Sequence, residues 1–501
     1  MGRRTFVVAA VVVALVAVGA VVVVRSRGAT DVLHTETGAR RPNVLVIMTD
    51  DQTLESVRVM DNVKSRLMGE GTTFSSAYVS FPNCCPSRAT YLTGQYAHNT
   101  GVKDNVPPLG GYTKLRADDT VALALQRSGY YTAHVGKYLN GWGSNGDITA
   151  PPGWDHWYGL IDPTTYRYFD YAVSDDGVRV DFGSDDGDYQ TDVLGAEVVE
   201  TIRAAPADKP WFVSFTPLAP HSEQLEGAAN DAGTTTTTAP GAAEEFRWAA
   251  PKPAPRHQQQ LAAKFPRGAS FNNLGTGKPE AIASKPELTE GFQRLIDQGY
   301  QKELQTLLAV DEWVGTILDT LEETGQLDDT VIVFTSDNGF FHGEHRLAFQ
   351  KYHLYEPSVH VPLVIRGGAF PKQGRVTQLA GNVDLAPTIY ALAGVSPSVT
   401  VDGIDLAALA TGDDPAPGRA LLLENDSAGG RVHAEAIHTG RYVLIEHETG
   451  ELELYDLQKD PEQLTNLAGD PAAASLLTNL QKRLAGLKEC SGDTCRAGQQ
   501  P

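Results

Sequence analysis

Positive charge is in short supply in this chain. Lysine and arginine together number 41 against 62 aspartates and glutamates, which leaves a formal net charge of −21 over 501 residues. Proteins that bind nucleic acid need clustered cations for the phosphates, so this balance argues against a nucleic-acid partner. It also disfavours a long polyanionic substrate, unless the binding site carries a positive field of its own. The apolar share of 41% and the charged share of 21% are those of an ordinary globular protein.

Cysteine is scarcer still. The chain holds four cysteines, and they form two close pairs, Cys84 with Cys85 and Cys490 with Cys495. The C-x4-C spacing of the second pair predicts a small loop closed by a disulfide. A metal site is the weaker alternative, because no further cysteine or histidine ligand lies nearby in sequence. A bond between the adjacent Cys84 and Cys85 would be strained and rare. Crossed pairing with the C-terminal cysteines stays open, so the sequence leaves the first pair unexplained at this point.

One long uncharged run stands near the N-terminus, at residues 5–24, with arginines on both sides. Twenty such residues can span a hydrocarbon core of roughly 30 Å at about 1.5 Å per residue. No convincing small-x-small cleavage site follows Val24, so residues 1–27 favour an uncleaved signal-anchor over a cleaved signal peptide. Both alternatives place the rest of the chain, after a polar linker at 28–41, outside the cytoplasm, where disulfides are permitted. Membrane contact is then expected only through this segment.

Strand and helix patterns alternate from residue 42 to 415. Four apolar runs read as buried strands that end in polar residues: "NVLVIMTDD" (43–51), "YYTAHVGK" (130–137), "WFVSFTPLAPH" (211–221) and "TVIVFTSDNG" (330–339). Helical patterns occupy 120–129, 300–325 and 383–395. Alternation of this kind predicts an α/β domain, a large sheet, expected to be mixed, that is covered by helices on both faces. Sites in such domains form beyond the carboxyl ends of the strands, where these polar residues gather.

Two further segments differ from this alternating pattern in composition and periodicity. Residues 222–290 are low in complexity and then rich in proline, which predicts a flexible surface insertion or, alternatively, a loop over the active site that helps to choose substrate. Residues 418–501 contain short alternating runs separated by turn signals, and a helix is expected at 472–487. This C-terminal part is predicted to be a second, small α+β domain, an antiparallel sheet with one helix.

Four hard oxygen ligands stand at the predicted strand ends: Asp50, Asp51, Asp337 and Asn338. Brought together, they would hold Ca²⁺ or Mg²⁺ rather than a soft metal, and Ca²⁺ suits a mixed carboxylate and amide site outside the cell. Taken singly, each pair is more simply explained as turn or helix-cap residues.

Three cations, Arg88, Lys137 and Lys351, are expected near the same edge. A tetrahedral oxyanion such as sulfate or phosphate would need such a group of donors. His221, in "LAPH", could bind the anion or the leaving group. The simpler alternatives are solvated surface charges and a packed loop histidine.

Five stretches then resemble one family. The run "CCPSRATYLTG" (84–94) matches C-x-P-S-R-x-x-x-L-T-G, the signature of formylglycine-dependent type I sulfatases, which belong to the alkaline-phosphatase-like superfamily. Four more stretches resemble the family, and all five occur along the chain in the family's order. The four are "PNVLVIMTDDQ" (42–52), "GKYLN" (136–140), "SDNGFFHGEHRL" (336–347) and "ELYDLQKDPEQLTNLA" (453–468). Their spelling is most similar to N-acetylglucosamine-6-sulfatase-like members.

The resemblance implies the family's chemistry. A maturation enzyme would oxidise Cys84 to Cα-formylglycine during export, and Cys85 would fill a variable slot. One hydroxyl of the aldehyde hydrate would attack sulfur and form a covalent sulfate ester. The second hydroxyl would let that ester collapse to the aldehyde and release sulfate, which a serine or a thiol cannot do.

Roles also follow residue by residue from the resemblance. One Ca²⁺ per chain would be held by Asp50, Asp51, Asp337, Asn338 and the modified Cys84. Arg88 would hold the hydrate, while Lys137, His221 and Lys351 would contact sulfate, with His221 or Lys351 placed to protonate the leaving oxygen. Many members carry a histidine two residues after the lysine of "GKW". This chain has Leu139 at that position, so the role of that histidine is not carried over. His221 is therefore the more important candidate histidine of the site.

The expected function is therefore that of an exported, Ca²⁺-dependent sulfatase acting on a small or terminal sulfate ester, expected to be a carbohydrate. A phosphate or phosphonate ester hydrolase on the same architecture is the alternative. A third hypothesis is a surface-anchored binding protein in which Cys84 remains a thiol.

Overall fold

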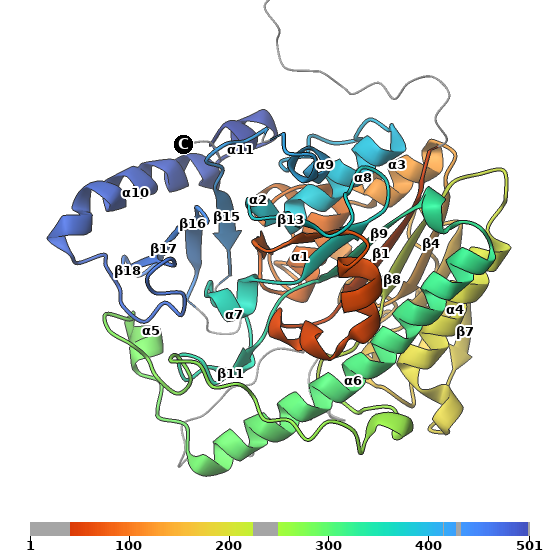
Figure 1. Cartoon of the computed structure of the whole chain (residues 1–501), viewed down its shortest axis with the longest axis horizontal. Coiled ribbons are helices and arrows are strands. Elements are labelled where there is room, and N and C mark those ends of the chain that lie inside the picture. Colours follow the sequence, from red (N-terminus) through yellow and green to blue (C-terminus); the bar gives the residue numbers. More distant parts are fainter. Residues whose placement is uncertain (1–40, 224–248, 414, 427–431, 499–501) are drawn as a thin grey trace, which may run out of the picture.

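The computed structural model describes residues 41–223, 249–413, 415–426 and 432–498 (Figure 1). Its larger part is built on one ten-stranded sheet. In spatial order the strands are β13 (Gly374–Val376), β2 (Thr72–Phe74), β12 (Leu363–Arg366), β9 (Thr330–Ser336), β1 (Asn43–Thr49), β8 (Trp211–Thr216), β4 (Tyr131–Gly136), β5 (His156–Leu160), β6 (Ala172–Asp175) and β7 (Val178–Asp181). The strands from β9 to β5 are parallel, and antiparallel pairs flank them on both sides. The predicted mixed sheet is confirmed.

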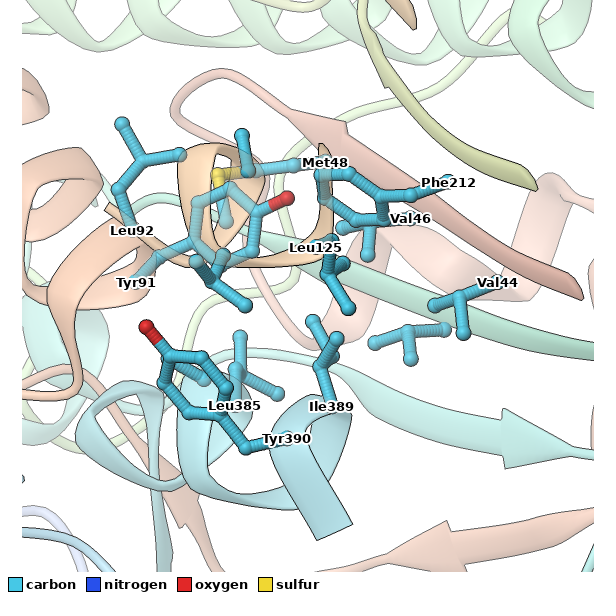
Figure 2. Close-up of a cluster of buried hydrophobic side chains, with 14 of the residues drawn as sticks. Val44, Val46, Met48, Tyr91, Leu92, Leu125, Phe212, Leu385, Ile389 and Tyr390 are labelled. Carbon is cyan, nitrogen blue, oxygen red and sulfur yellow. The ribbon is translucent and has the colours of Figure 1, made fainter. Parts of the chain in front are cut away.

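The central strand β1 shows why the sheet needs cover on both faces. All seven of its residues are buried, as expected for a parallel strand between two layers of helices. Because side chains alternate along a strand, Val44, Val46 and Met48 enter one hydrophobic cluster, while Leu45 and Ile47 enter another on the opposite face. In Figure 2 the first cluster lies between β1 and two helices, which contribute Tyr91, Leu92, Leu385 and Ile389, among others.

The helices divide between these two faces. The first cluster is covered by α1 (Cys84–Thr93), α3 (Val121–Arg127), α8 (Leu385–Ala393) and α9 (Leu406–Ala410). The second is covered by α4 (Gln190–Ala204) and α6 (Glu290–Glu323), which run side by side in Figure 1. The contact between α4 and α6 is close, since Gly195 packs against the ring of Trp313.

The longest helix differs from its predicted bounds. The pattern at 300–325 predicts only its second part, whereas α6 begins at Glu290, where the Thr289 side chain accepts a hydrogen bond from the backbone N–H of Phe292. Gly291 and Gly299 weaken the helical propensity of the first turns. Burial of Ile296 in a hydrophobic cluster outweighs that weakness.

The C-terminal part is a four-stranded antiparallel sheet with a helix, as expected. Its strands are β15 (Leu421–Glu424), β16 (Ala434–His438), β17 (Tyr442–His447) and β18 (Leu452–Asp456), paired in that order. Helix α10 (Ala474–Lys488) packs Leu480, Leu484 and Leu487 into the core of this sheet. Cys490 and Cys495 form a disulfide beside it, while Cys84 and Cys85 are free and buried. The predicted C-terminal loop is confirmed, and the crossed pairing is not formed.

Short elements complete the described chain. Two-stranded pairs are formed by β3 (Ala77–Tyr78) with β14 (Ala380–Gly381) and by β10 (Phe341–His342) with β11 (Ala348–Gln350). Short helices are α2 (Ala97–Thr100), α5 (Glu280–Ala283), α7 (Glu356–Val359) and α11 (Asp493–Gly498). Short 3-10 helices lie at Glu55–Val59, Tyr112–Lys114, Ala117–Asp119, Thr164–Tyr166, Asp186–Asp188, Pro255–His257, Leu327–Asp329, Asn382–Asp384 and Pro471–Ala473, and a π-helix at Val63–Met68.

The predicted insertion is described at residues 222–223 and from residue 249 onward, and this second part is fixed to the rest of the molecule by specific hydrogen bonds. Glu462 of the C-terminal part accepts hydrogen bonds from the backbone of Ala269 and Ser270. The Lys278 side chain, which is buried, reaches Glu453 at 3.5 Å and the Tyr455 hydroxyl at 2.8 Å. The segment from residue 249 to 290 therefore contacts the C-terminal part of the chain through these hydrogen bonds. Residues 224–248 lie outside the described part, and the expectation for them stays a prediction.

The predicted membrane segment at residues 5–24 also lies outside the described residues. Within the described ranges, no helix combines the length and the apolar character needed to cross a membrane.

Candidate active site

The site is built at the carboxyl ends of β1 and β9. These neighbours are parallel and in register along their whole length, from Asn43 opposite Thr330 to Thr49 opposite Ser336. The residues that follow the two strands therefore meet. The backbone N–H of Asp51 donates to Asp337 Oδ1 at 3.1 Å, and Asn338 Nδ2 donates to Asp51 Oδ1 at 2.6 Å.

Cys84 enters this group at the start of α1. Asn83 precedes the helix with extended backbone angles, and its side chain accepts a hydrogen bond from the Cys84 N–H at 3.0 Å. Pro86 is tolerated in the first turn because its missing N–H has no partner inside the helix. The helix is buried along its whole length, so Cys84 is held rigidly with its Sγ 3.4 Å from Asp50 Oδ1.

Two lysines reach Cys84 from different parts of the chain. Lys137 comes directly after β4, and Lys351 directly after β11. Their Nζ atoms lie 3.3 Å and 2.9 Å from Cys84 Sγ, respectively. Each also bonds a carboxylate, Lys137 with Asp50 and Lys351 with Asp51.

Arg88, one helical turn after Cys84, uses its guanidinium to join three groups. Nε donates to Asp337 Oδ2 at 2.8 Å, Nη2 to Asp50 Oδ2 at 3.3 Å, and Nη1 to the backbone carbonyl of Lys137 at 2.8 Å. All of these side chains are buried. Arg88 thus ties together the ends of β1, β9 and β4.

His221 closes the group on a further side, just beyond β8. Its Nε2 lies 3.6 Å from Asp51 Oδ2, and its Nδ1 is 2.7 Å from the carbonyl of Ser222. A carbonyl accepts hydrogen bonds, so Nδ1 carries the proton and Nε2 of a neutral ring is left with its lone pair. Nε2 is buried without a hydrogen-bond partner. Burial lowers the pKa of His221, which favours this neutral ring.

The structure thus brings together every residue singled out for the site: Asp50, Asp51, Cys84, Arg88, Lys137, His221, Asp337, Asn338 and Lys351. Three are carboxylates and three are basic side chains, so their formal charges balance. Although burial acts to raise it, the neighbouring cations, Lys137 first, hold the pKa of Asp50 well below its usual range. Burial acts to lower the pKa of Lys351, but Asp51 and its other neighbours hold it well above its usual range.

Cys84 itself is a poor nucleophile as a thiol. Burial raises its pKa well above the usual range, and the charge of Asp50 adds to this effect. The lysines act in the opposite direction but do not prevail. Because the thiolate is the reactive form of cysteine, the site as built does not activate this sulfur.

The donor set also suits a divalent cation. Ligand atoms of Asp50, Asp51, Cys84 and His221 all lie within 4.8 Å of one another. The side-chain oxygen of Asn338 is buried without a hydrogen-bond partner, although its amide nitrogen is bonded. Carboxylate and amide oxygens are the ligands that Ca²⁺ and Mg²⁺ prefer. An unsatisfied buried oxygen beside two aspartates is what such an ion would satisfy.

Comparison with known proteins decides the family. The family model described as Sulfatase matches residues 42–395, which is most of the chain. The chain belongs to the sulfatase family. A second model, described as N-sulphoglucosamine sulphohydrolase, C-terminal, matches residues 343–490 of this sulfatase. As a family member the chain is a sulfuric ester hydrolase.

Relatives extend over nearly the whole sulfatase. It is 32% identical to N-acetylglucosamine-6-sulfatase of Homo sapiens over 521 aligned positions, which cover 94% of this chain and 88% of the relative. A protein solved in complex with its substrate D-glucosamine-2-N,6-O-disulfate is 25% identical, with a TM-score of 0.74, and the match covers 91% of this chain and 99% of that one. A phosphonate monoester hydrolase of Agrobacterium radiobacter, 22% identical with a TM-score of 0.65, shares the fold over 89% of this chain and 95% of its own.

Sequence reasoning missed one aromatic residue at the sulfatase site. Tyr166 lies in the 3-10 turn Thr164–Tyr166, between β5 and β6, and its ring faces both Lys137 and His221. No motif marks it, because it stands among other aromatics in "TTYRYFDY" (164–171). Leu139, by contrast, points into the hydrophobic cluster under the sheet and takes no part in the site.

Proposed function

We propose that this sulfatase acts outside the cytoplasm on 6-O-sulfated glucosamine-type sugars, with Cα-formylglycine derived from Cys84 and one Ca²⁺ ion in its site. The observation that carries the proposal is the position of Cys84. Its Sγ lies 2.9 and 3.3 Å from two lysine ammonium groups and 3.4 Å from a carboxylate. Cations gathered around one buried side-chain atom form an environment for an anionic ester.

A buried thiol with a raised pKa is poorly suited to nucleophilic attack, so the proposal assigns the nucleophile to a group derived from Cys84. Formylglycine, once formed, would supply an oxygen nucleophile from its hydrate together with a second hydroxyl on the same carbon, which a thiol lacks. The Cys-x-Pro-Ser-Arg motif at 84–88 is the part of the chain that a maturation enzyme would recognise. Arg88, already fixed by Asp50 and Asp337, would stabilise negative charge that develops on the nucleophilic oxygen.

Ca²⁺ would be held by Asp50, Asp51, Asp337 and Asn338, together with the modified Cys84, and would supply the positive charge that a sulfate ester and its nucleophile need. Lys137 and Lys351 remain charged in the site and would bind sulfate oxygens. His221 would contact sulfate through its unpartnered Nε2 once that nitrogen takes up a proton, which an anionic ester beside it favours, and either this protonated ring or Lys351 would give the proton to the leaving oxygen.

The relatives support the proposed substrate class. The human relative is named for 6-sulfated N-acetylglucosamine, and the 25% identical solved protein holds a glucosamine sulfated at nitrogen and at oxygen 6. The formal charge of −21 favours a small or terminal ester over a long sulfated polymer. Export through the N-terminal segment at 1–27, anchored or cleaved, belongs to the same proposal.

A substrate panel tests this function. The protein, produced in a host that has the maturation enzyme, is assayed with glucosamine 6-sulfate, N-acetylglucosamine 6-sulfate, an aryl sulfate and an aryl phosphate. We expect the highest kcat/KM for a 6-sulfated amino sugar. Sulfate monoesters carry one negative charge and phosphate monoesters about two at neutral pH, so a large preference for the aryl phosphate would contradict the proposal and favour the phosphohydrolase alternative.

Mass spectrometry tests the modification separately. Oxidation of the Cys84 side chain to the aldehyde lowers the mass of its tryptic peptide by about 18 Da. An unmodified peptide from active protein would contradict the role of formylglycine.

A further inference from the structure

Tyr166 contacts both of the side chains that we propose as sulfate ligands on one side of the site. The centroid of its ring lies 4.7 Å from Lys137 Nζ and 5.1 Å from the centroid of the His221 ring, with the two ring planes at 45°. The side chain is 2% exposed. Its aromatic face is therefore part of the wall of the site and not of its solvent-exposed rim.

The ring is held in place by its hydroxyl group. Asn140 Nδ2 donates a hydrogen bond to the Tyr166 hydroxyl at 2.6 Å, and Asn140 is itself 3% exposed. Asn140 lies three residues after Lys137 in the same loop. In the facing loop, Asp162 accepts a hydrogen bond from the N–H of Gly141. The two loops that carry Lys137 and Tyr166 are thus joined at both the backbone and the side chain.

The surroundings of Lys137 explain what the ring contributes. Its ammonium group has three N–H donors, of which one reaches Asp50 and another Cys84 Sγ. A further acceptor on the side of Tyr166 would occupy the last donor. An aromatic face attracts the cation without accepting a conventional hydrogen bond from it, and the attraction is strongest when water is excluded.

We propose that Tyr166 is a positioning residue for the sulfate-binding pair Lys137 and His221. Its face holds the Lys137 ammonium toward Cys84 with one N–H left for the ester, and the same ring limits the rotation of His221. The proposal rests on the proposed function, because it takes these two side chains as ligands of sulfate.

The test compares two substitutions at Tyr166 with a matched one elsewhere. Tyr166→Leu removes the aromatic face, and Tyr166→Phe keeps the face but removes the bond from Asn140. Tyr171→Leu is the control, since Tyr171 is equally buried but stacks on Phe182 and not on a site residue. For each variant, KM, kcat and the inhibition constant of inorganic sulfate are measured and corrected for folded, formylglycine-bearing protein.

We expect Tyr166→Leu to raise KM and the inhibition constant for sulfate by about tenfold or more, as loss of a buried cation–π contact implies. Tyr166→Phe should change both by less than about threefold, and Tyr171→Leu should leave both unchanged. If Tyr166→Leu does not fold, Tyr166→Met replaces it, because methionine fills similar space without an aromatic face.

Equal constants for the Leu or Met variant and the control would overturn the role of Tyr166. So would a loss in kcat alone with normal inhibition by sulfate. Failure of the proposed function has a different signature: the wild-type protein, with its modification verified, would cleave no sulfate ester and would not bind inorganic sulfate in a direct titration. That result overturns both proposals, whereas the first two outcomes leave the proposed function intact.

Discussion

At the scale of single residues, two adjacent cysteines have unlike surroundings. Cys84 Sγ lies among Asp50, Lys137 and Lys351, whereas Cys85 belongs to the hydrophobic cluster beneath the sheet. Both are fully buried, and neither forms a disulfide. Their proximity in sequence therefore reflects the start of a helix, where successive side chains point in different directions.

This difference leads to the first prediction. Cys84→Ala should abolish turnover, because no other side chain can supply the proposed aldehyde. Cys85→Ser should keep most of the activity per folded molecule, although a hydroxyl in an apolar pocket costs roughly 1–3 kcal/mol of stability. Both variants are measured by kcat/KM with a sulfated sugar and by denaturant unfolding. Equal loss of activity in the two variants would point to a structural role for the pair.

At the scale of elements, β1 and β9 together position the acidic part of the site. Their parallel register brings two dipeptides, Asp50-Asp51 and Asp337-Asn338, to the same point of the sheet edge. Neither strand alone supplies enough oxygen ligands for a divalent ion.

The second prediction concerns this proposed ion. Exhaustive treatment with a Ca²⁺ chelator should suppress sulfatase activity, and added Ca²⁺ should restore it, because the carboxylates would otherwise be paired only with the site's own cations. The free energy of unfolding should rise with Ca²⁺ concentration, since an ion that binds the folded state stabilises it. Activity that persists through complete chelation would contradict the metal site.

Helix packing provides the third prediction. A Cβ atom added at Gly195 of α4 would lie 2.2 Å from a ring carbon of Trp313 on α6. Gly195→Ala should therefore destabilise the protein by about 1–3 kcal/mol, despite the better helix propensity of alanine. Gly486→Ala in α10 is the matched control, because a Cβ there meets no atom within 4 Å beyond the adjoining residues and backbone of its own helix.

The control should stabilise the protein by about 0.5–1 kcal/mol through helix propensity alone. Free energies of unfolding from denaturant titrations measure both effects. If both substitutions stabilise the protein, then α4 and α6 pack less closely than the structure indicates.

At the scale of the whole molecule, Glu356 links the two sheets. One carboxylate oxygen lies 3.1 Å from His360 Nδ1, and the other lies 3.1 Å from His438 Nε2 on β16 of the C-terminal sheet. Tyr78, from the large domain, packs against both imidazole rings. Burial acts to raise the pKa of Glu356, but the hydrogen bonds from His360 and His438 lower it to about 2.

The fourth prediction follows from the sign of this shift. A carboxyl group with a lower pKa in the folded state stabilises the fold above its unfolded pKa, near 4.5, and loses that contribution as the pH falls toward 2. We expect wild-type stability to fall through this range by an amount on the order of 2–3 kcal/mol from Glu356. In Glu356→Gln that part of the pH dependence should be absent, as followed by unfolding midpoints from pH 6 to 2. Parallel curves for the two proteins would contradict this role.

The sequence predicted the fold where patterns are local. The apolar runs of β1, β4, β8 and β9 lie within the predicted segments, and β8 ends at Thr216 because Pro217 has no N–H to donate to the sheet. The hairpin of β6 and β7 was missed, although Asp176-Gly177 between alternating residues is a usual turn signal. Its strands are too short and polar to stand out by hydrophobicity.

The residues of the candidate site likewise divide into those that a local pattern predicted and one that it did not. Cys84, the acidic strand ends and the three cations could be named in advance because each stands in a motif or at a strand end, and the structure brings all of them together. Tyr166 could not, since nothing in its neighbours distinguishes it from the tyrosines beside it.

The sequence by itself therefore determined the alternation of strands and helices, the sulfatase motifs and the identity of the charged groups, since each is written in neighbouring residues. Only the tertiary structure decided which groups touch: that Arg88 joins three strand ends, that His221 keeps a buried nitrogen unpartnered, and that Tyr166 faces Lys137. Such contacts depend on the register of parallel strands far apart in the chain. No local pattern specifies that register, because it is set by the packing of two helical layers on one sheet.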